Sequence, residues 1–240
     1  MSTLRGHIHS TVPYSAADGP GGRFVVFMQG CNFDCGSCQN PETIDRSTSS
    51  GRWATAEEII AEIRESAPFI RGVTVSGGEP TLQPDFLEGL FVAIRECEDL
   101  AHLTILVDSN GAAPIDVWDR LLPLVDGVMV DLKALDPELH EELTGSGNAI
   151  VLQSIRHLAA AGKLEHVGVL AVPGFTTDDR SMHAAASWIH TVARGVPIRL
   201  IRFRPEGVRA PSRSIPEPSA SEMRHMRDVM LGNNVIVEIA

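Results

Sequence analysis

The stretch VTVSGGEP, residues 73–80, passes directly from a β-branched apolar run into a glycine-rich turn that ends in an acid and a proline. Similar steps follow four later apolar runs, which end in DSN (108–110), DLK (131–133), VPG (172–174) and RFR (202–204). In a βα barrel the catalytic face lies at the carboxyl ends of the strands, so five such ends would line one mouth. The regular recurrence of such strand ends favours a barrel of the TIM type over a doubly wound sheet.

Strand and helix patterns alternate along the chain. The runs typical of strands are 22–28, 72–76, 102–108, 126–132, 166–172, 197–203 and 234–239. The clearest helix begins at Thr55, which forms a capping box with Glu58. Further amphipathic segments lie near 83–97, 115–124, 136–143, 150–162, 180–193 and 218–232. With right-handed crossovers, this order predicts an α/β fold, a partial (β/α)6 barrel.

The composition is that of an ordinary globular protein, with 43% hydrophobic and 21% charged residues among 240. We expect one domain over residues 1–240, with a Pro-rich flap at 205–218. No apolar run approaches the ~20 residues of a membrane span and no signal peptide is evident, which predicts a cytoplasmic protein without a membrane partner. The net charge of −11 disfavours nucleic acid as a partner.

Three of the four cysteines lie together in the loop GCNFDCGSC (30–38), as Cys31, Cys35 and Cys38. In a reducing cytosol such a cluster holds metal more often than it forms disulfides, and thiolates suit zinc or an iron–sulfur cluster. A 4Fe–4S cluster held by only three thiolates keeps one iron free to bind something else. Zinc is the alternative, and Cys97 is predicted to be an incidental thiol outside the site.

Six motifs in order extend this interpretation, within a likeness that spans about residues 7 to 204. They are ADGPGGRFVVFMQGCNFDCGSCQNPET, SGGEP, DSNG, VMVDLK, HEELTG and VPGF. The chain thereby resembles the radical S-adenosylmethionine (SAM) superfamily and, more narrowly, the glycyl radical enzyme activases of the pyruvate formate-lyase activating enzyme group. The resemblance implies a partial barrel of the radical SAM type, a 4Fe–4S cluster and SAM as cofactors.

The resemblance also implies a role for each matching residue. Cys31, Cys35 and Cys38 would ligate the cluster and form the catalytic centre, and Asp18 would lie near an incoming peptide. The residues implied to contact SAM are Gly77, Gly78, Glu79, Asp108, Ser109, Asp131, Lys133 and Arg204. A monovalent cation would bind at Asp108, Ser109, Met129 and Asp131. The amino acid part of SAM is zwitterionic, so its amino group needs hydrogen-bond acceptors and its carboxylate needs a cation. The residues implied to contact SAM provide both.

Two positions depart from the family pattern. Ser37 stands before the third cysteine, where relatives usually carry an aromatic residue near the adenine, so Phe33 or the run 170–172 would have to hold that base. Arg204 stands where a histidine is expected. Arg202 and Arg204 share a strand face with Leu200, so both would reach the mouth if Leu200 points inward. We assign Arg204 to the cofactor carboxylate and Arg202 to the substrate side; pairing with surface acids is the alternative.

The implied reaction is reductive cleavage of SAM to methionine and a 5′-deoxyadenosyl radical, which abstracts a glycine α-hydrogen from a glycyl radical enzyme. The chain lacks the cysteine-rich insert of some activases, so the electron would come from an external reductant such as flavodoxin or ferredoxin. Two alternatives stay open. One is a radical SAM enzyme acting on a small anionic substrate, such as a natural product or nucleoside. The other is a non-catalytic iron–sulfur protein.

Overall fold

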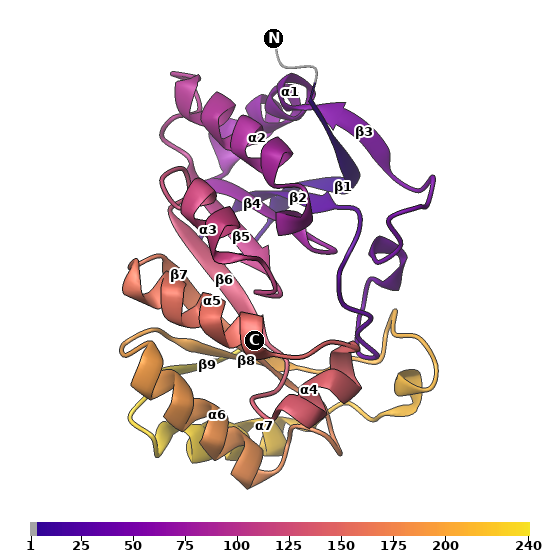
Figure 1. Ribbon diagram of the computed structural model, residues 1–240, viewed down its shortest axis with the longest axis vertical. Helices are drawn as coiled ribbons and strands as arrows, with labels where there is room; N and C mark the ends of the chain where they lie inside the picture. The colour runs from indigo at the N-terminus through magenta and orange to yellow at the C-terminus, as the bar shows by residue number, and fades with distance from the viewer. Residues whose placement is uncertain (1–3) are drawn as a thin grey trace. The chain divides into compact units, whose positions relative to one another are not determined.

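The computed structural model describes residues 4–240, which form two compact units that the chain enters repeatedly. The first unit holds 4–32, 42–109 and 113–128, and the second holds 33–41, 110–112 and 129–240. The single domain expected over residues 1–240 stays a prediction. Figure 1 labels the elements.

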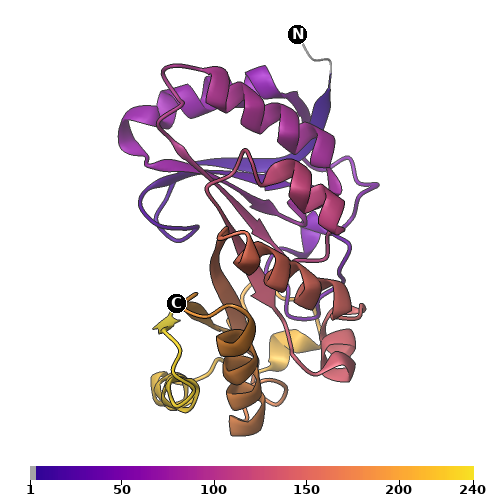
Figure 2. The same cartoon turned by 60° about the vertical axis from the view of Figure 1, so that its left-hand side comes forward.

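The first unit combines a mixed set of parallel and antiparallel strand pairs with three helices. Its strands are β1 (Arg5–Ser15), β2 (Arg23–Met28), β3 (Arg52–Thr55), β4 (Gly72–Gly77) and β5 (Thr104–Ser109), in the order β3-β1-β2-β4-β5. β1 runs antiparallel to β2 and β3, whereas β2, β4 and β5 are parallel. The helices are α1 (Ala56–Ser66), α2 (Pro84–Glu96) and α3 (Ile115–Leu121). Figure 2 shows α1 and α2 stacked on one face of these strands.

The second unit continues the alternation of strand and helix. β6 (Gly127–Leu132) enters it at Met129 and is followed by β7 (Leu164–Ala171), β8 (Ile198–Arg202) and β9 (Val237–Ile239). β7, β8 and β9 pair in parallel in that order. The helices are α4 (Pro137–Thr144), α5 (Ala149–Ala160), α6 (Asp179–Val192) and α7 (Ala220–Leu231). In Figure 1, α6 and α7 lie next to each other.

The predicted elements agree closely with these bounds. Seven predicted strands correspond to β2 and β4–β9, and every predicted helix is present, including the capping box of Thr55 and Glu58 on α1. Two strands were missed. β1 is buried only near its start and has two register irregularities, and β3 is four residues long, so neither carries a periodic apolar signal. Among the described residues, no helix is long and apolar enough to cross a membrane.

Candidate active site

The glycine pair of the first unit allows two backbone segments to approach each other closely. Gly77 has a φ of +118°, which favours glycine, and a Cβ on Gly78 would lie 2.2 Å from the carbonyl oxygen of Gly30. The amide of Gly78 donates to Met28 O at 3.0 Å, and that of Glu79 donates to Gly30 O at 2.7 Å. The turn after β4 is therefore fixed against the residue that precedes Cys31.

The Glu79 carboxylate joins this turn to the end of β5. Its side chain is fully buried, and its Oε1 accepts hydrogen bonds from the Ser109 hydroxyl at 2.9 Å and from the Thr81 amide at 3.0 Å. Next to it, Asp108 accepts a hydrogen bond from the Ser76 hydroxyl at 2.8 Å. The first unit thus brings together the predicted residues of the GGE turn and of the DSN strand end.

In the second unit, the cysteine loop rests on the carboxyl end of α4. The amide of Asp34 donates to Thr144 O at 2.9 Å, and the amide of Gly36 donates to Leu143 O at 3.1 Å. The last carbonyls of a helix have no partner within it, so the loop amides satisfy two of them. The amide of Cys38 donates to Cys35 O at 3.2 Å and closes a turn that carries both thiols.

The HEELTG motif explains how α4 ends at this place. His140 is fully buried, its Nδ1 lies 2.8 Å from Ser146 O, and Gly145 ends the helix with a φ of +72°. The His140 ring also makes an edge contact with Phe33 of the cysteine loop, with 5.5 Å between ring centroids. The motif therefore shapes the platform that receives the loop, a purpose that its sequence alone did not reveal.

Several predicted residues of the second unit line one small hollow. Its lining comprises Cys35, Ser37, Lys133, Leu143, Thr144, Leu170 and Val172. Ser37 thus faces two members of the apolar run that was predicted to hold the adenine. Cys35, a predicted cluster ligand, and Lys133, the predicted partner of the SAM carboxylate, line the same hollow.

Asp131 and Lys133 form an ion pair beside this hollow, with 2.6 Å between Oδ2 and Nζ. A Cβ on Gly168 would lie 2.2 Å from Asp131 Oδ1, so the glycine in β7 leaves room for that carboxylate. Burial raises the pKa of the Cys35 thiol, and the nearby Lys133 ammonium opposes this rise. A metal-bound cysteine must be deprotonated, so Lys133 favours the ligating form.

The cysteines fit an iron–sulfur cluster by the chemistry of their donor set. Three thiols stand in C-x3-C-x2-C spacing in a glycine-containing loop, and the loop amides of residues 34 and 36 are held by α4 rather than by the thiols. Cys31 belongs to the first unit, and Cys35 and Cys38 to the second. Cys97 follows α2, where its sulfur lies 3.5 Å from a guanidinium nitrogen of Arg64.

The two arginines near the end of β8 differ in their surroundings. Leu200 pairs in register with Val169, whose neighbour Gly168 faces Asp131, so Leu200 and Arg202 lie on the opposite face of the strands from that carboxylate. Arg202 forms an ion pair with Glu217 at 3.4 Å. Both arginines were expected to reach the mouth only if Leu200 pointed inward, and Leu200 points away from Asp131. The pair with Glu217 favours the surface-acid alternative for Arg202.

Neither Arg204 nor Asp18 is among the residues that line the hollow beside Cys35. The Arg204 side chain is exposed, and its carbonyl accepts a hydrogen bond from the Gln39 amide group at 3.4 Å. In the first unit, the Asp18 carboxylate accepts from the Ser15 hydroxyl, and its carbonyl accepts from Thr74 at 2.7 Å. Both assigned roles stay predictions.

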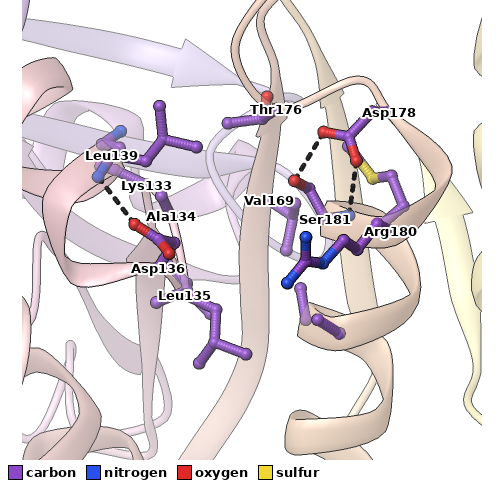
Figure 3. Close-up of a pocket in the computed structure, with 14 residues that line it drawn as sticks. Lys133, Ala134, Leu135, Asp136, Leu139, Val169, Thr176, Asp178, Arg180 and Ser181 are labelled. Carbon is purple, nitrogen blue, oxygen red and sulfur yellow. Dashed lines mark hydrogen bonds between the residues drawn. The ribbon is translucent and has the colours of Figure 1, made fainter.

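A larger hollow of about 460 Å³ lies on the α6 side of the second unit. Figure 3 shows Lys133, Leu135 and Asp136 on one side of it and Thr176, Asp178, Arg180 and Ser181 on the other. Asp136 and Asp178 are already used there as the N-caps of α4 and α6. Apart from Lys133, its lining contains none of the predicted site residues, so size alone does not mark the site.

Comparison with known proteins assigns the chain to the same family as the sequence motifs do. Residues 25–186 match the Radical SAM superfamily. The pyruvate formate-lyase-activating enzyme of Streptococcus mutans is 30% identical over 95% of this chain and 91% of that protein. The pyruvate formate-lyase 1-activating enzyme of Escherichia coli K12 is 34% identical over 86% of this chain and 84% of that protein.

A solved structure confirms the fold at lower identity. The crystal structure of a radical SAM methyltransferase from Sphaerobacter thermophilus superposes with a TM-score of 0.70, at 17% identity, over 91% of this chain and 66% of that one. This likeness confirms the α/β partial barrel of the radical SAM type. Together with the sequence matches, it shows that the chain belongs to the radical SAM superfamily and, within it, to the family of the pyruvate formate-lyase-activating enzymes.

Proposed function

We propose that this protein activates a glycyl radical enzyme by abstracting a glycine α-hydrogen from it. The observation that carries the proposal is the match to activating enzymes along 95% of the chain, which includes the cysteine triplet and the SGGEP and DLK strand ends. The grouping of Cys35, Ser37 and Lys133 around one hollow supports it. Enzymes of the superfamily use a 4Fe–4S cluster and SAM, which are the cofactors of this chain.

When bound, the cluster supplies the electron that cleaves SAM to methionine and a 5′-deoxyadenosyl radical. Cys31, Cys35 and Cys38 hold the cluster. The backbone of Gly77 and Gly78 receives the amino end of SAM, where buried Glu79 fixes the turn to Ser109. Lys133 neutralises the carboxylate, and the Asp131–Lys133 pair keeps the ammonium in place. Arg204 is assigned to the same carboxylate; because its side chain is exposed and does not line this hollow, the assignment requires that side chain to turn inward.

The remaining assignments concern the surroundings of that centre. Asp108, Ser109, Met129 and Asp131 provide oxygen and sulfur ligands for a monovalent cation. Asp18 and Arg202 are assigned to the substrate side; for Arg202 this requires release of Glu217. The reductant is an external one-electron carrier such as flavodoxin or ferredoxin, and the place of action is the cytoplasm.

Anaerobic reconstitution tests the proposal directly. The protein is loaded with iron and sulfide and incubated with dithionite and SAM. Methionine and 5′-deoxyadenosine are then measured with and without a pyruvate formate-lyase, whose glycyl radical is read by electron paramagnetic resonance. We expect SAM cleavage and a glycyl radical in the partner. Cleavage without any such radical would support the small-substrate alternative, and bound zinc without iron would overturn the radical chemistry.

Cysteine replacements provide the matched control. Replacing Cys31, Cys35 or Cys38 by alanine should abolish SAM cleavage, because the free iron exists only when all three thiolates hold the cluster. Cys97→Ala should keep both iron and cleavage, since Cys97 is a partly buried thiol at the end of a helix. Iron content and visible absorption of the four variants check this. Loss of iron from Cys97→Ala would show that the ligands are wrongly assigned.

A further inference from the structure

The segment 204–215 lies against the cysteine loop within the second unit. Val208 is buried with Val172 and Phe203, and Ile215 packs against the same cluster, so apolar contacts anchor the flap at both ends. Polar contacts then join it to the loop. Gln39 donates to Arg204 O at 3.4 Å, and a Cβ on Gly207 would lie 2.3 Å from Gln39 O.

Arg209 donates a hydrogen bond directly to a predicted cluster ligand residue. One of its terminal nitrogens, Nη2, donates to the Asp34 carboxylate and, at 3.3 Å, to the carbonyl oxygen of Cys35. Further along, a Cβ on Gly36 would lie 3.0 Å from the Ser212 hydroxyl. A single guanidinium thus bridges the flap, an acid of the cysteine loop and the backbone of a ligand residue.

We propose that Arg209 is a positioning residue of the iron–sulfur centre: with Asp34 it clamps the flap onto the cysteine loop and tunes the reduction potential of the cluster. The proposal rests on the proposed function, since it takes Cys35 as a cluster ligand. Groups that are hydrogen-bonded to the ligands of a metal orient those ligands and tune the metal. Arg209 occupies such a place through the Cys35 carbonyl.

The charges of the clamp act on the cluster in opposite directions. Reduction adds a negative charge to the cluster, which the Arg209 guanidinium stabilises and the Asp34 carboxylate opposes. In the intact pair the two effects largely cancel. Removing the guanidinium alone should lower the midpoint potential, and removing the carboxylate alone should raise it. A merely structural clamp would give both variants the same kind of defect.

Redox titration of the reconstituted protein tests this without a substrate or partner. Arg209→Gln should shift the midpoint downward, Asp34→Asn upward, and the double variant should return toward the unaltered protein. Arg209→Lys keeps the charge and should keep the potential. Arg213→Gln, which removes an exposed charge from the same flap, is the matched control and should shift the potential less than Arg209→Gln. Single variants that shift in the same direction, or no more than Arg213→Gln, would overturn the tuning role.

Hydrogen exchange of the metal-free protein tests the clamp separately. The ion pair is partly exposed, with 44% of the Arg209 and 67% of the Asp34 side chain accessible, so its loss should speed amide exchange in 205–218 by roughly two- to fivefold. Arg213→Gln should leave the exchange unchanged. Equal exchange in Arg209→Gln and Arg213→Gln would overturn the clamp. If the protein binds no iron on reconstitution, the proposed function is overturned. The clamp still stands in that case if amide exchange is faster in Arg209→Gln than in the unaltered protein.

Discussion

Gly78 shows how a single residue fixes the relation between two motifs. Its missing side chain lets the GGE turn lie against the backbone of Gly30, so that Glu79 N can donate to Gly30 O. A methyl group there would meet the carbonyl oxygen and carbon of Gly30, which are backbone atoms and cannot rotate away. The glycine is therefore required by packing rather than by flexibility.

We predict that Gly78→Ala lowers the free energy of unfolding by about 1–3 kcal/mol, the usual cost of forcing a methyl group into a filled site. Gly89→Ala is the matched control, because Gly89 lies inside α2 and its Cβ would meet nothing within 4 Å. That variant should be stabilised by roughly 0.5–1 kcal/mol. Urea unfolding of both metal-free variants measures the difference. Equal stability of the two would contradict the close approach.

At the scale of elements, α4 carries the cysteine loop through a buried histidine. The desolvation of His140 lowers its pKa below the ordinary 6.5, a nearby Lys133 adds to this, and the hydrogen bond to Ser146 opposes it. Its Nε2 is buried and has no hydrogen-bond partner among the described residues, so a proton there would find no acceptor. The end of α4 is thus built for a neutral imidazole.

This predicts a pH dependence of stability. Between the lowered native pKa and the ordinary value, the unfolded chain binds the proton more readily than the folded one. The stabilisation is therefore complete above about pH 6.5 and is lost as the pH falls through the native pKa. His140→Asn should flatten this part of the profile, since an amide can donate to Ser146 O but does not titrate. Urea unfolding of the metal-free protein between pH 5 and 7.5 checks this, and an unchanged slope would contradict it.

Elements also show where a sequence pattern stops being informative. The Thr55–Glu58 capping box and the helices were predictable because caps and apolar spacing are local signals. β1 was not, because it is buried only near its start and its register is irregular. For β8, a period of two correctly grouped Leu200 with Arg202, but no local signal says which face of a strand points toward Asp131.

For the molecule as a whole, order along the chain was more informative than any one motif. Strand ends that follow one another in sequence predicted the barrel, and the similarity to solved radical SAM enzymes confirms it. What the sequence could not give is contact between distant segments. The flap 205–218 was visible as a Pro-rich stretch, yet its attachment to the cysteine loop through Arg209 depends on tertiary packing.

Cofactor binding should appear as a change in the stability of the whole protein. In this superfamily the amino and carboxylate groups of SAM are expected to chelate the free iron, so SAM should bind tightly only when the cluster is present. At about 100 times its Kd, a ligand stabilises the folded state by about 2.7 kcal/mol. For a chain of this size that corresponds to a rise in Tm of roughly 5–10 °C.

Anaerobic calorimetry of the cluster-loaded and metal-free protein measures this rise. SAM should raise Tm only in the loaded form, and methylthioadenosine, which lacks the amino acid part, should raise it little. Lys133→Ala should reduce the rise because it removes the ammonium assigned to the carboxylate, whereas Lys163→Ala, at a lysine just before β7, should not. An equal rise in loaded and metal-free protein would mean that SAM is held by the chain alone, against the role assigned to the cysteines.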